Sequence, residues 1–237
     1  MCLPQEFPRS NLTVTTSKLN WIERKPMSNL LFQSGEKVLF IGDSITDCGR
    51  RGDHAPLGNG YVKKITELIT AKYPERRIEY VNKGIGGDIV EGLEARWDTD
   101  VIAEKPDWLS VKIGINNASR QLGAGIPNET YLPEWEMCYR RILTRAKDEL
   151  GAGLFMFETF YIEEDVPEPR PLDVDAYNKI IHRLADEFNA RLIRTNEAFD
   201  RAVDARPGAL WTTQDGVHPN PEGHTLMALA FLKQAGW

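Results

Sequence analysis

The sequence predicts a single α/β domain, in which a parallel sheet of five strands is covered by helices on both faces. Five short apolar runs, rich in β-branched and aromatic residues, alternate with longer segments of helical period. Parallel neighbours need a crossover connection, so this alternation is typical of a sheet wrapped on both sides. A length of 237 residues suits one large domain better than two.

The order of the elements also indicates where to look for a site. The predicted strands are Lys37–Ile41, Ile78–Asn82, Trp108–Ile113, Leu154–Phe157 and Arg191–Ile193. The predicted helices are Tyr61–Lys72, Val90–Ala103, Leu132–Leu150, Val174–Asn189, Glu197–Ala205 and Pro221–Gln234. Asp173 precedes one helix as a capping residue, and Pro221 suits the first turn of the last. Ligands of such sheets bind beyond the carboxyl ends of the strands, so the loops there are the candidate site.

The N-terminal residues 1–32 are expected to be an extension of a domain that spans 33–237. They show no sustained period and mix Pro, Ser, Thr and Asn. Two interpretations stay open: a loose or mis-assigned extension, with Met27 as the true start, and an arm that packs on a neighbouring subunit.

Composition excludes several classes of partner. The net charge of −6, without a block of Lys and Arg, argues against nucleic acid. No apolar stretch reaches the length of a membrane span or of a secretion signal's core, so no membrane partner is expected. The three cysteines, Cys2, Cys48 and Cys138, are odd in number and widely spaced, which favours a reducing, cytoplasmic location over a disulfide framework.

A serine follows the first predicted strand in the stretch Gly42-Asp43-Ser44-Ile45-Thr46. It either caps the next helix or acts as a nucleophile, with its hydroxyl at the crevice and its N–H at the positive end of a helix dipole. At this position alone the two interpretations are evenly balanced. The Gly-x-Ser-x-Gly elbow is absent, because Thr46 stands at its second glycine.

The next two strand ends carry possible oxyanion donors. In "NKGIGGDIV" the glycines form a turn or expose the N–H of Gly87, and the dinucleotide fingerprint fails because Ile89 replaces its last glycine. In "GINNAS" the amide of Asn116 either donates to an oxyanion or bonds local backbone. Taken singly, each residue favours the structural interpretation.

The C-terminal loop supplies a base and its partner. Asp215 lies three residues before His218 in "QDGVHPNPEGH", and a serine nucleophile needs a histidine whose other ring nitrogen is held by a third group. A metal site is not expected, because His218 and His224 are six apart with no third ligand nearby. Cys48 is expected to be a buried thiol rather than a second nucleophile.

In their order along the chain, these motifs resemble the blocks of the SGNH (GDSL-type) hydrolases. The resemblance implies a flavodoxin-like three-layer α/β/α sandwich and an esterase that needs no metal or cofactor. It further implies a catalytic triad of Ser44, Asp215 and His218, and an oxyanion hole formed by Ser44, Gly87 and Asn116. The chain departs from the family at Asn117, where an Asp is usual, and this change is expected to affect rate and loop rigidity more than identity.

The closer resemblance is to the bacterial acetylxylan esterase branch, over residues 33–237 and through "SGEKVLFIGDSITDCGR", "VNKGIGG" and "VHPNPEGH". It implies removal of acetyl groups from xylan or xylo-oligosaccharides through an acetyl-enzyme, often inside the cell and in a homo-oligomer. The expected partner is therefore an acetyl ester of a small molecule or an oligosaccharide. Two alternatives are a short-chain lipid esterase, lysophospholipase or thioesterase on the same triad, and a silent carbohydrate-binding protein.

Four residues are expected to contact the substrate, namely Asp43, Arg50, Tyr161 and Trp211. Asp43 also suits the turn, and Arg50 suits a solvated surface. The acetylxylan esterase branch tends to place an aromatic residue directly before the triad Asp, whereas Gln214 stands there in this chain. Since an aromatic ring at that point would stack on a sugar, the preference for carbohydrate follows less directly than the ester chemistry.

Overall fold

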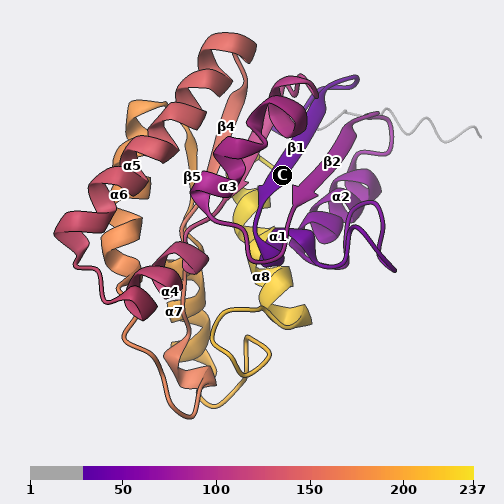
Figure 1. Cartoon of the computed structure of the whole chain (residues 1–237). Helices are drawn as coiled ribbons and strands as arrows, with labels where there is room; N and C mark the ends of the chain where they lie inside the picture. The colour runs from indigo at the N-terminus through magenta and orange to yellow at the C-terminus, as the bar shows by residue number, and fades with distance from the viewer. Residues whose placement is uncertain (1–28) are drawn as a thin grey trace, which may run out of the picture.

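The computed structural model describes residues 29–237 and contains a five-stranded sheet in which every pairing is parallel. The strands are β1 (Lys37–Gly42), β2 (Glu79–Gly84), β3 (Trp108–Lys112), β4 (Gly153–Phe157) and β5 (Arg191–Ile193). Their order across the sheet is β2-β1-β3-β4-β5 (Figure 1). The parallel sheet predicted from the sequence is confirmed.

Helices cover both faces of this sheet (Figure 1). The helices are α1 (Ser44–Asp47), α2 (Tyr61–Lys72), α3 (Val90–Ala95), α4 (Ile115–Ala124), α5 (Asn128–Arg145), α6 (Val174–Glu187), α7 (Thr195–Ala205) and α8 (Pro221–Gln234). Short π-helical turns extend two segments, Asp98–Ile102 after α3 and Ala146–Leu150 after α5, and a 3-10 turn covers Glu163–Asp165. Helices α2 and α8 pack together on one face, whereas α3, α5 and α6 lie on the other.

Two helix starts follow the expected capping rules. The Asp173 carboxylate accepts a hydrogen bond from the N–H of Ala176 at 3.1 Å. The last helix begins with Pro221 in its first turn and is capped by Asn220, whose side chain accepts from the N–H of Gly223 at 2.8 Å. A proline tolerates this position because the first N–H groups of a helix have no intrahelical partner.

Helix α4 differs from the prediction, which assigned its first residues to a loop. Two Asn residues and Gly123 give the segment low helix propensity. The helix nevertheless forms because Ile115, Ala118 and Gln121 are buried on one face of it. Its start is set by Gly114, whose φ of 141° is open to glycine alone. Tertiary packing therefore outweighs local preference here.

The strand order reverses between β1 and β3, as an open doubly wound sheet requires at its ligand-binding edge. The ends of these two strands are paired in register, with Gly42 opposite Lys112. Ser44 follows one of these ends and Asn116 the other. The topology therefore brings the two sequence-predicted site loops to one crevice.

The N-terminal boundary lies earlier than predicted. Leu30 and Phe32 are 2% and 0% exposed and belong to the hydrophobic core. The N–H of Leu31 donates to the carbonyl of Ala235 at 2.9 Å, which joins this segment to the end of α8. Residues 29–32 are thus part of the domain, and the boundary at 33 is wrong. The interpretation of Met27 as a start lies outside the described residues. Within 29–237, no helix has the length and apolarity to cross a membrane.

Candidate active site

The turn that carries Ser44 depends on a close approach of two strand ends. A Cβ atom at Gly42 would lie 2.2 Å from the carbonyl oxygen of Lys112, so only glycine fits at the end of β1. The helix cap is Asp43, whose carboxylate accepts from the N–H of Ile45 at 3.0 Å. Ser44 is the first helical residue and not the cap. Because α1 is a single turn of four residues, the expected contribution of a helix dipole is small.

Below this turn, Asp43 and Lys112 form a buried ion pair. Nζ of Lys112 lies 3.1 Å from Oδ2 of Asp43, and both side chains are 0% exposed. Burial lowers the pKa of Lys112, while the charge and hydrogen bond of Asp43 oppose this shift. The prediction that Asp43 contacts substrate is wrong, because its carboxylate is enclosed. Lys112 was missed, although a lysine inside the apolar run "WLSVKI" is a signal for such a partner.

Ser44, His218 and Asp215 are hydrogen-bonded in series. Oγ of Ser44 lies 2.8 Å from Nε2 of His218, and Nδ1 of His218 lies 2.6 Å from Oδ2 of Asp215. The other oxygen of Asp215 accepts the backbone N–H groups of His218 and Val217 at 2.8 and 2.9 Å. Burial by itself would raise the pKa of Asp215, but the hydrogen bonds from His218 and Val217 outweigh it and lower that pKa. The carboxylate is thereby kept charged beside the imidazole.

A second, buried carboxylate holds the loop that carries this pair. Oδ2 of Asp165, a residue 4% exposed, accepts the N–H of Trp211 at 2.8 Å and both the N–H and the hydroxyl of Thr212. The Thr212 oxygen in turn accepts the N–H of Gly216 at 3.1 Å. Asp165 therefore ties the segment after β4 to the turn of Asp215 and His218. Nothing in the sequence pattern singled it out.

Two backbone N–H groups at this site, those of Ser44 and Gly87, have no hydrogen-bond partner within residues 29–237. The neighbouring groups are satisfied, since Gly86 donates to Asp47 at 3.2 Å and Asp88 to the carbonyl of Ile85 at 3.2 Å. The backbone of Gly87 has φ of 77°, and a Cβ built there would meet nothing within 4 Å. Both N–H groups are thus available to a ligand.

The side chain of Asn116 lies against the same loop. Its Nδ2 donates one hydrogen to the carbonyl of Asp88 at 2.9 Å. An amide nitrogen carries two hydrogens, so the second is left for another acceptor. The sheet edge thus carries the hydrogen-bonded series of Ser44, His218 and Asp215, with Gly87 and Asn116 on the segments after the two neighbouring strands.

The sequence matches the model of the GDSL-like lipase/acylhydrolase family over residues 40–226, from within β1 to within α8. The chain belongs to this family. An acetylxylan esterase of Geobacillus stearothermophilus is 43% identical over 213 residues, which cover 86% of this chain and 95% of that protein. The predicted resemblance to the GDSL-type hydrolases is therefore confirmed. The family is one of carboxylic ester hydrolases, so the predicted enzyme class is confirmed as well. The predicted α/β fold is confirmed by the parallel sheet described above.

Solved structures agree with this assignment. The acetylxylan esterase Axe2 from Geobacillus stearothermophilus superposes with a TM-score of 0.77 at 42% identity, covering 86% of this chain and 96% of that one. LAE5, described as an alpha/beta hydrolase enzyme from the metagenome of Lake Arreo, gives a TM-score of 0.76 at 32% identity, covering 86% and 97%. Axe2 structures described as catalytic mutants replace a serine, an aspartate and a histidine by alanine.

The family's usual Asp in block three is replaced here by Asn117, and this residue is fully buried in a hydrogen-bond network. Its Oδ1 accepts the N–H of Val90 at 3.1 Å. Its Nδ2 donates to Oε2 of Glu91 at 3.0 Å and to the hydroxyl of Tyr131 at 2.9 Å. A carboxylate has no hydrogen to donate to Glu91. In this GDSL-like chain, the replacement therefore suits the residues around it.

Cys48, at the end of the helix that begins with Ser44, forms a contact with His224. Sγ of Cys48 lies 3.3 Å from Nε2 of His224, whose Nδ1 accepts the N–H of Tyr61 at 3.2 Å. An accepting Nδ1 places the proton of the neutral ring on Nε2. Burial raises the pKa of the thiol to about 12, with smaller contributions from nearby carboxylates. Cys48 is therefore a protonated packing group that is only partly buried, where a buried thiol was expected. His224 has a structural role.

The remaining predicted substrate contacts are held by the protein itself. Nε of Arg50 donates to the carbonyl of Gly84 at 2.6 Å. Tyr161 is 9% exposed, its hydroxyl accepts the N–H of Arg170 at 3.0 Å, and its ring packs against Gly216. Trp211 is partly buried against the core with its Nε1 enclosed. None of the three side chains forms an exposed platform beside Ser44.

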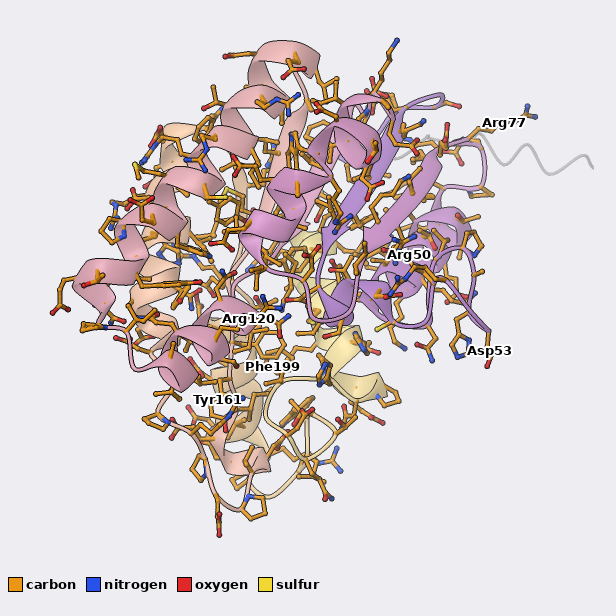
Figure 2. All side chains as sticks on the ribbon, in the orientation of Figure 1. Arg50, Asp53, Arg77, Arg120, Tyr161 and Phe199 are labelled. Atoms are coloured by element: carbon orange, nitrogen blue, oxygen red, sulfur yellow. The ribbon has the colours of Figure 1, made fainter. Side chains whose placement is uncertain are left out.

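Tyr161 also lines a cavity of about 230 Å³ together with Ile162, Glu164, Asn196, Phe199, Asp200, Val203 and Asp204. Tyr161 and Phe199 are labelled near each other in the lower half of Figure 2. The lining contains neither Ser44 nor His218, so this cavity is distinct from the ester site. Among residues 29–237, no group of three or more His, Cys, Asp or Glu side chains is arranged to hold a metal ion.

Proposed function

We propose that this chain is a serine esterase that removes acetyl groups from acetylated xylan or xylo-oligosaccharides. The observation that carries the proposal is the continuous hydrogen-bonded series from Ser44 through His218 to Asp215, at 2.8 and 2.6 Å. In this arrangement Nε2 of His218 accepts the hydroxyl proton as Oγ attacks the ester carbonyl. Asp215 holds the ring in the required tautomer and stabilises the imidazolium that forms.

The oxyanion of the tetrahedral intermediate is bound by the free N–H groups of Ser44 and Gly87 and by the second amide hydrogen of Asn116. Collapse of the intermediate expels the sugar alcohol, which takes the proton back from His218, and leaves an acetyl-enzyme on Ser44. Water then repeats the sequence and releases acetate. Replacing Asn116 by Ala removes one donor and is expected to reduce kcat by about 10² to 10³ fold.

The substrate class is supported by the 43% identity to an acetylxylan esterase over most of both chains. One local difference bears on it. In Axe2 a tryptophan directly precedes the aspartate of the catalytic mutant, whereas Gln214 precedes Asp215 in this chain. Gln214 has φ of 69° and offers no ring for stacking on a sugar. Sugar recognition in this chain therefore does not use an aromatic ring directly before the triad aspartate.

The decisive experiment compares p-nitrophenyl esters of two to eight carbons with acetylated xylobiose and acetylated glucose. A carbohydrate deacetylase is expected to lose activity beyond about three carbons and to prefer xylobiose, because its acyl site need hold only a methyl group. Activity that rises from acetate to octanoate would instead identify a lipid esterase or thioesterase. In each assay Ser44→Ala should fall to background. Absence of fluorophosphonate labelling at Ser44 would favour a silent binding protein.

We also propose that the enzyme is cytoplasmic and forms a homo-oligomer that binds neither nucleic acid nor membranes. Within residues 29–237 the cysteines Cys48 and Cys138 are both free, which supports a reducing compartment. The net charge of −6 supports the lack of affinity for a phosphate backbone. Light scattering coupled to size-exclusion chromatography measures the assembly, and a mass of 26.9 kDa would argue for a monomer.

A further inference from the structure

Helix α4 holds two consecutive carbonyl groups of the loop that carries Gly87. Asn116 donates to the carbonyl of Asp88 at 2.9 Å. Nη2 of Arg120 donates to the carbonyl of Gly87 at 3.1 Å. The two side chains are four residues apart and therefore lie on one face of the helix. One helix thus carries an oxyanion donor and also clamps the segment that supplies another.

Within residues 29–237, Arg120 makes the side-chain hydrogen bond to the Gly87 carbonyl. The N–H on the other side of that peptide group, from Asp88, donates to the carbonyl of Ile85 at 3.2 Å. The residues on either side have their own anchors: Gly86 is bonded to Asp47, and the Asp88 carboxylate is paired with Arg96 at 2.8 Å. Gly87 has no side chain, its φ is 77°, and nothing lies within 4 Å of where a Cβ would be. A glycine can adopt many backbone conformations, so a hydrogen bond to the carbonyl of Gly87 restricts this residue more than it would restrict a residue with a side chain.

Arg120 is exposed and lies in the middle of α4, near the centre of Figure 2, whereas Asn116 is partly covered. An exposed arginine loses rotamer entropy when it is fixed. A hydrogen bond to a single carbonyl offsets part of this cost, and the gain is a fixed orientation of the loop. Preorganised donors are effective in oxyanion holes because they need no rearrangement as charge develops.

We propose that Arg120 is a positioning residue of the oxyanion hole, which orients the Gly87 N–H through the adjacent carbonyl. The proposal rests on the esterase function proposed above and deepens it. Arg120 acts through Gly87 and not on the sugar, so its effect should be the same for every acetyl ester. It should appear in kcat, because an oxyanion donor is used only once the tetrahedral intermediate forms.

The test measures kcat and KM of Arg120→Ala and Arg120→Lys with p-nitrophenyl acetate and with acetylated xylobiose. For Arg120→Ala we expect kcat to fall about tenfold on both substrates, less than the loss of a whole donor, with KM changed less than about twofold. Arg120→Lys should recover part of the loss, because an ammonium can donate to the same carbonyl. Added guanidinium at millimolar concentration should raise kcat of Arg120→Ala and leave the wild type unchanged.

Arg77→Ala is the matched control, since Arg77 is an arginine at the upper right edge of Figure 2, away from Arg120 near its centre. It should keep wild-type kcat. Melting temperatures of the variants within about 2 °C of wild type would exclude unfolding as the cause. Wild-type kcat in Arg120→Ala would overturn the proposal, as would a rise in KM confined to xylobiose, which would make Arg120 a sugar ligand. A wild-type protein inactive on p-nitrophenyl acetate would instead refute the esterase function.

Discussion

Asp43 and Lys112 are joined by an ion pair in which neither side chain has exposed surface, directly beneath the turn that carries Ser44. Replacing Lys112 by Met leaves the Asp43 carboxylate buried without its counter-ion. We expect a loss of about 3–5 kcal/mol in the free energy of unfolding, measured by urea titration. Lys63→Met is the control, because its pair with Glu67 is more than half exposed and should contribute under about 0.5 kcal/mol. Equal effects of the two changes would contradict the prediction.

The network around Asn117 predicts that the family's usual residue is harmful here. In Asn117→Asp a carboxylate faces the Glu91 carboxylate, where the present donor lies 3.0 Å from Oε2. We expect a loss of about 1–2 kcal/mol, because Glu91 is exposed and water screens the repulsion. Adding Glu91→Gln should restore most of the lost free energy of unfolding. The new amide at position 91 can donate a hydrogen bond to the carboxylate introduced at position 117, which replaces the bond that was lost.

A double-mutant cycle of thermal unfolding measures this coupling between positions 91 and 117. The single change Glu91→Gln serves as the control and should cost less than Asn117→Asp. Additive effects of the two changes would show that position 117 does not sense the charge at position 91.

His224 predicts how stability depends on pH. Burial lowers the pKa of this imidazole from 6.5 to about 4, helped by the charges of Lys64, His218 and Lys112. The unfolded chain therefore binds a proton near pH 6.5 that the folded chain refuses until pH 4. The contribution of His224 to the free energy of unfolding is fully present above pH 6.5. It is lost as the pH falls, by up to about 3 kcal/mol at pH 4.

The variant His224→Gln removes this titration. Urea unfolding at several pH values between 4 and 7 should show a flatter acid limb for His224→Gln than for the wild type, whatever its stability at pH 7. The control is His54→Gln, which replaces a histidine in an exposed loop. Parallel curves for the wild type and His224→Gln would contradict the prediction.

Gly216 lies between the two triad residues of the C-terminal loop, and it tests how tightly that loop must fit. A Cβ there would lie 2.6 Å from Cε2 of Tyr161 and 2.8 Å from the carbonyl oxygen of Ile162, and φ is 71°. Gly208→Ala has similar backbone strain at φ of 78° but no neighbour within 4 Å. We expect Gly208→Ala to cost about 1 kcal/mol and to keep full activity.

Gly216→Ala should cost more than about 2 kcal/mol and reduce kcat at least about tenfold, because the clash moves Asp215 and His218 off Ser44. Calorimetric melting and p-nitrophenyl acetate hydrolysis measure the two effects. Equal kcat values for the two alanine variants would show that the loop tolerates displacement.

The sheet was predictable because its strands are strongly apolar and separated by long periodic segments. All five predicted strands are present, and α2 and α8 begin and end at the predicted residues. Helix α4 was not predictable from local pattern, since "GINNAS" has the composition of a loop and its helix depends on packing. The ion pair of Lys112 with Asp43 escaped prediction for a related reason, because partners 69 residues apart are joined only by strand register.

The site residues were predictable for another reason. Ser44, Gly87 and Asn116 each follow a strand end, and a parallel sheet brings such ends together whatever the details of packing. Residues that act through others left no such signal. Asp165 lies in an acidic run, "EED", and Arg120 lies four positions after Asn116 on a helix that was itself missed. The roles of Asp165 and Arg120 depend on which backbone groups their side chains reach in the folded chain.

The hydrogen bond between Ser44 and His218 joins residues separated by 174 positions, almost the whole described chain. A refolding chain cannot regain ester hydrolysis until its last loop has docked on its first strand, and closing so large a loop costs entropy that is recovered late. Turnover therefore reports the completion of folding rather than the formation of secondary structure. In a population recovering from denaturant, the fraction of molecules that hydrolyse an acetyl ester equals the fraction in which His218 has reached Ser44.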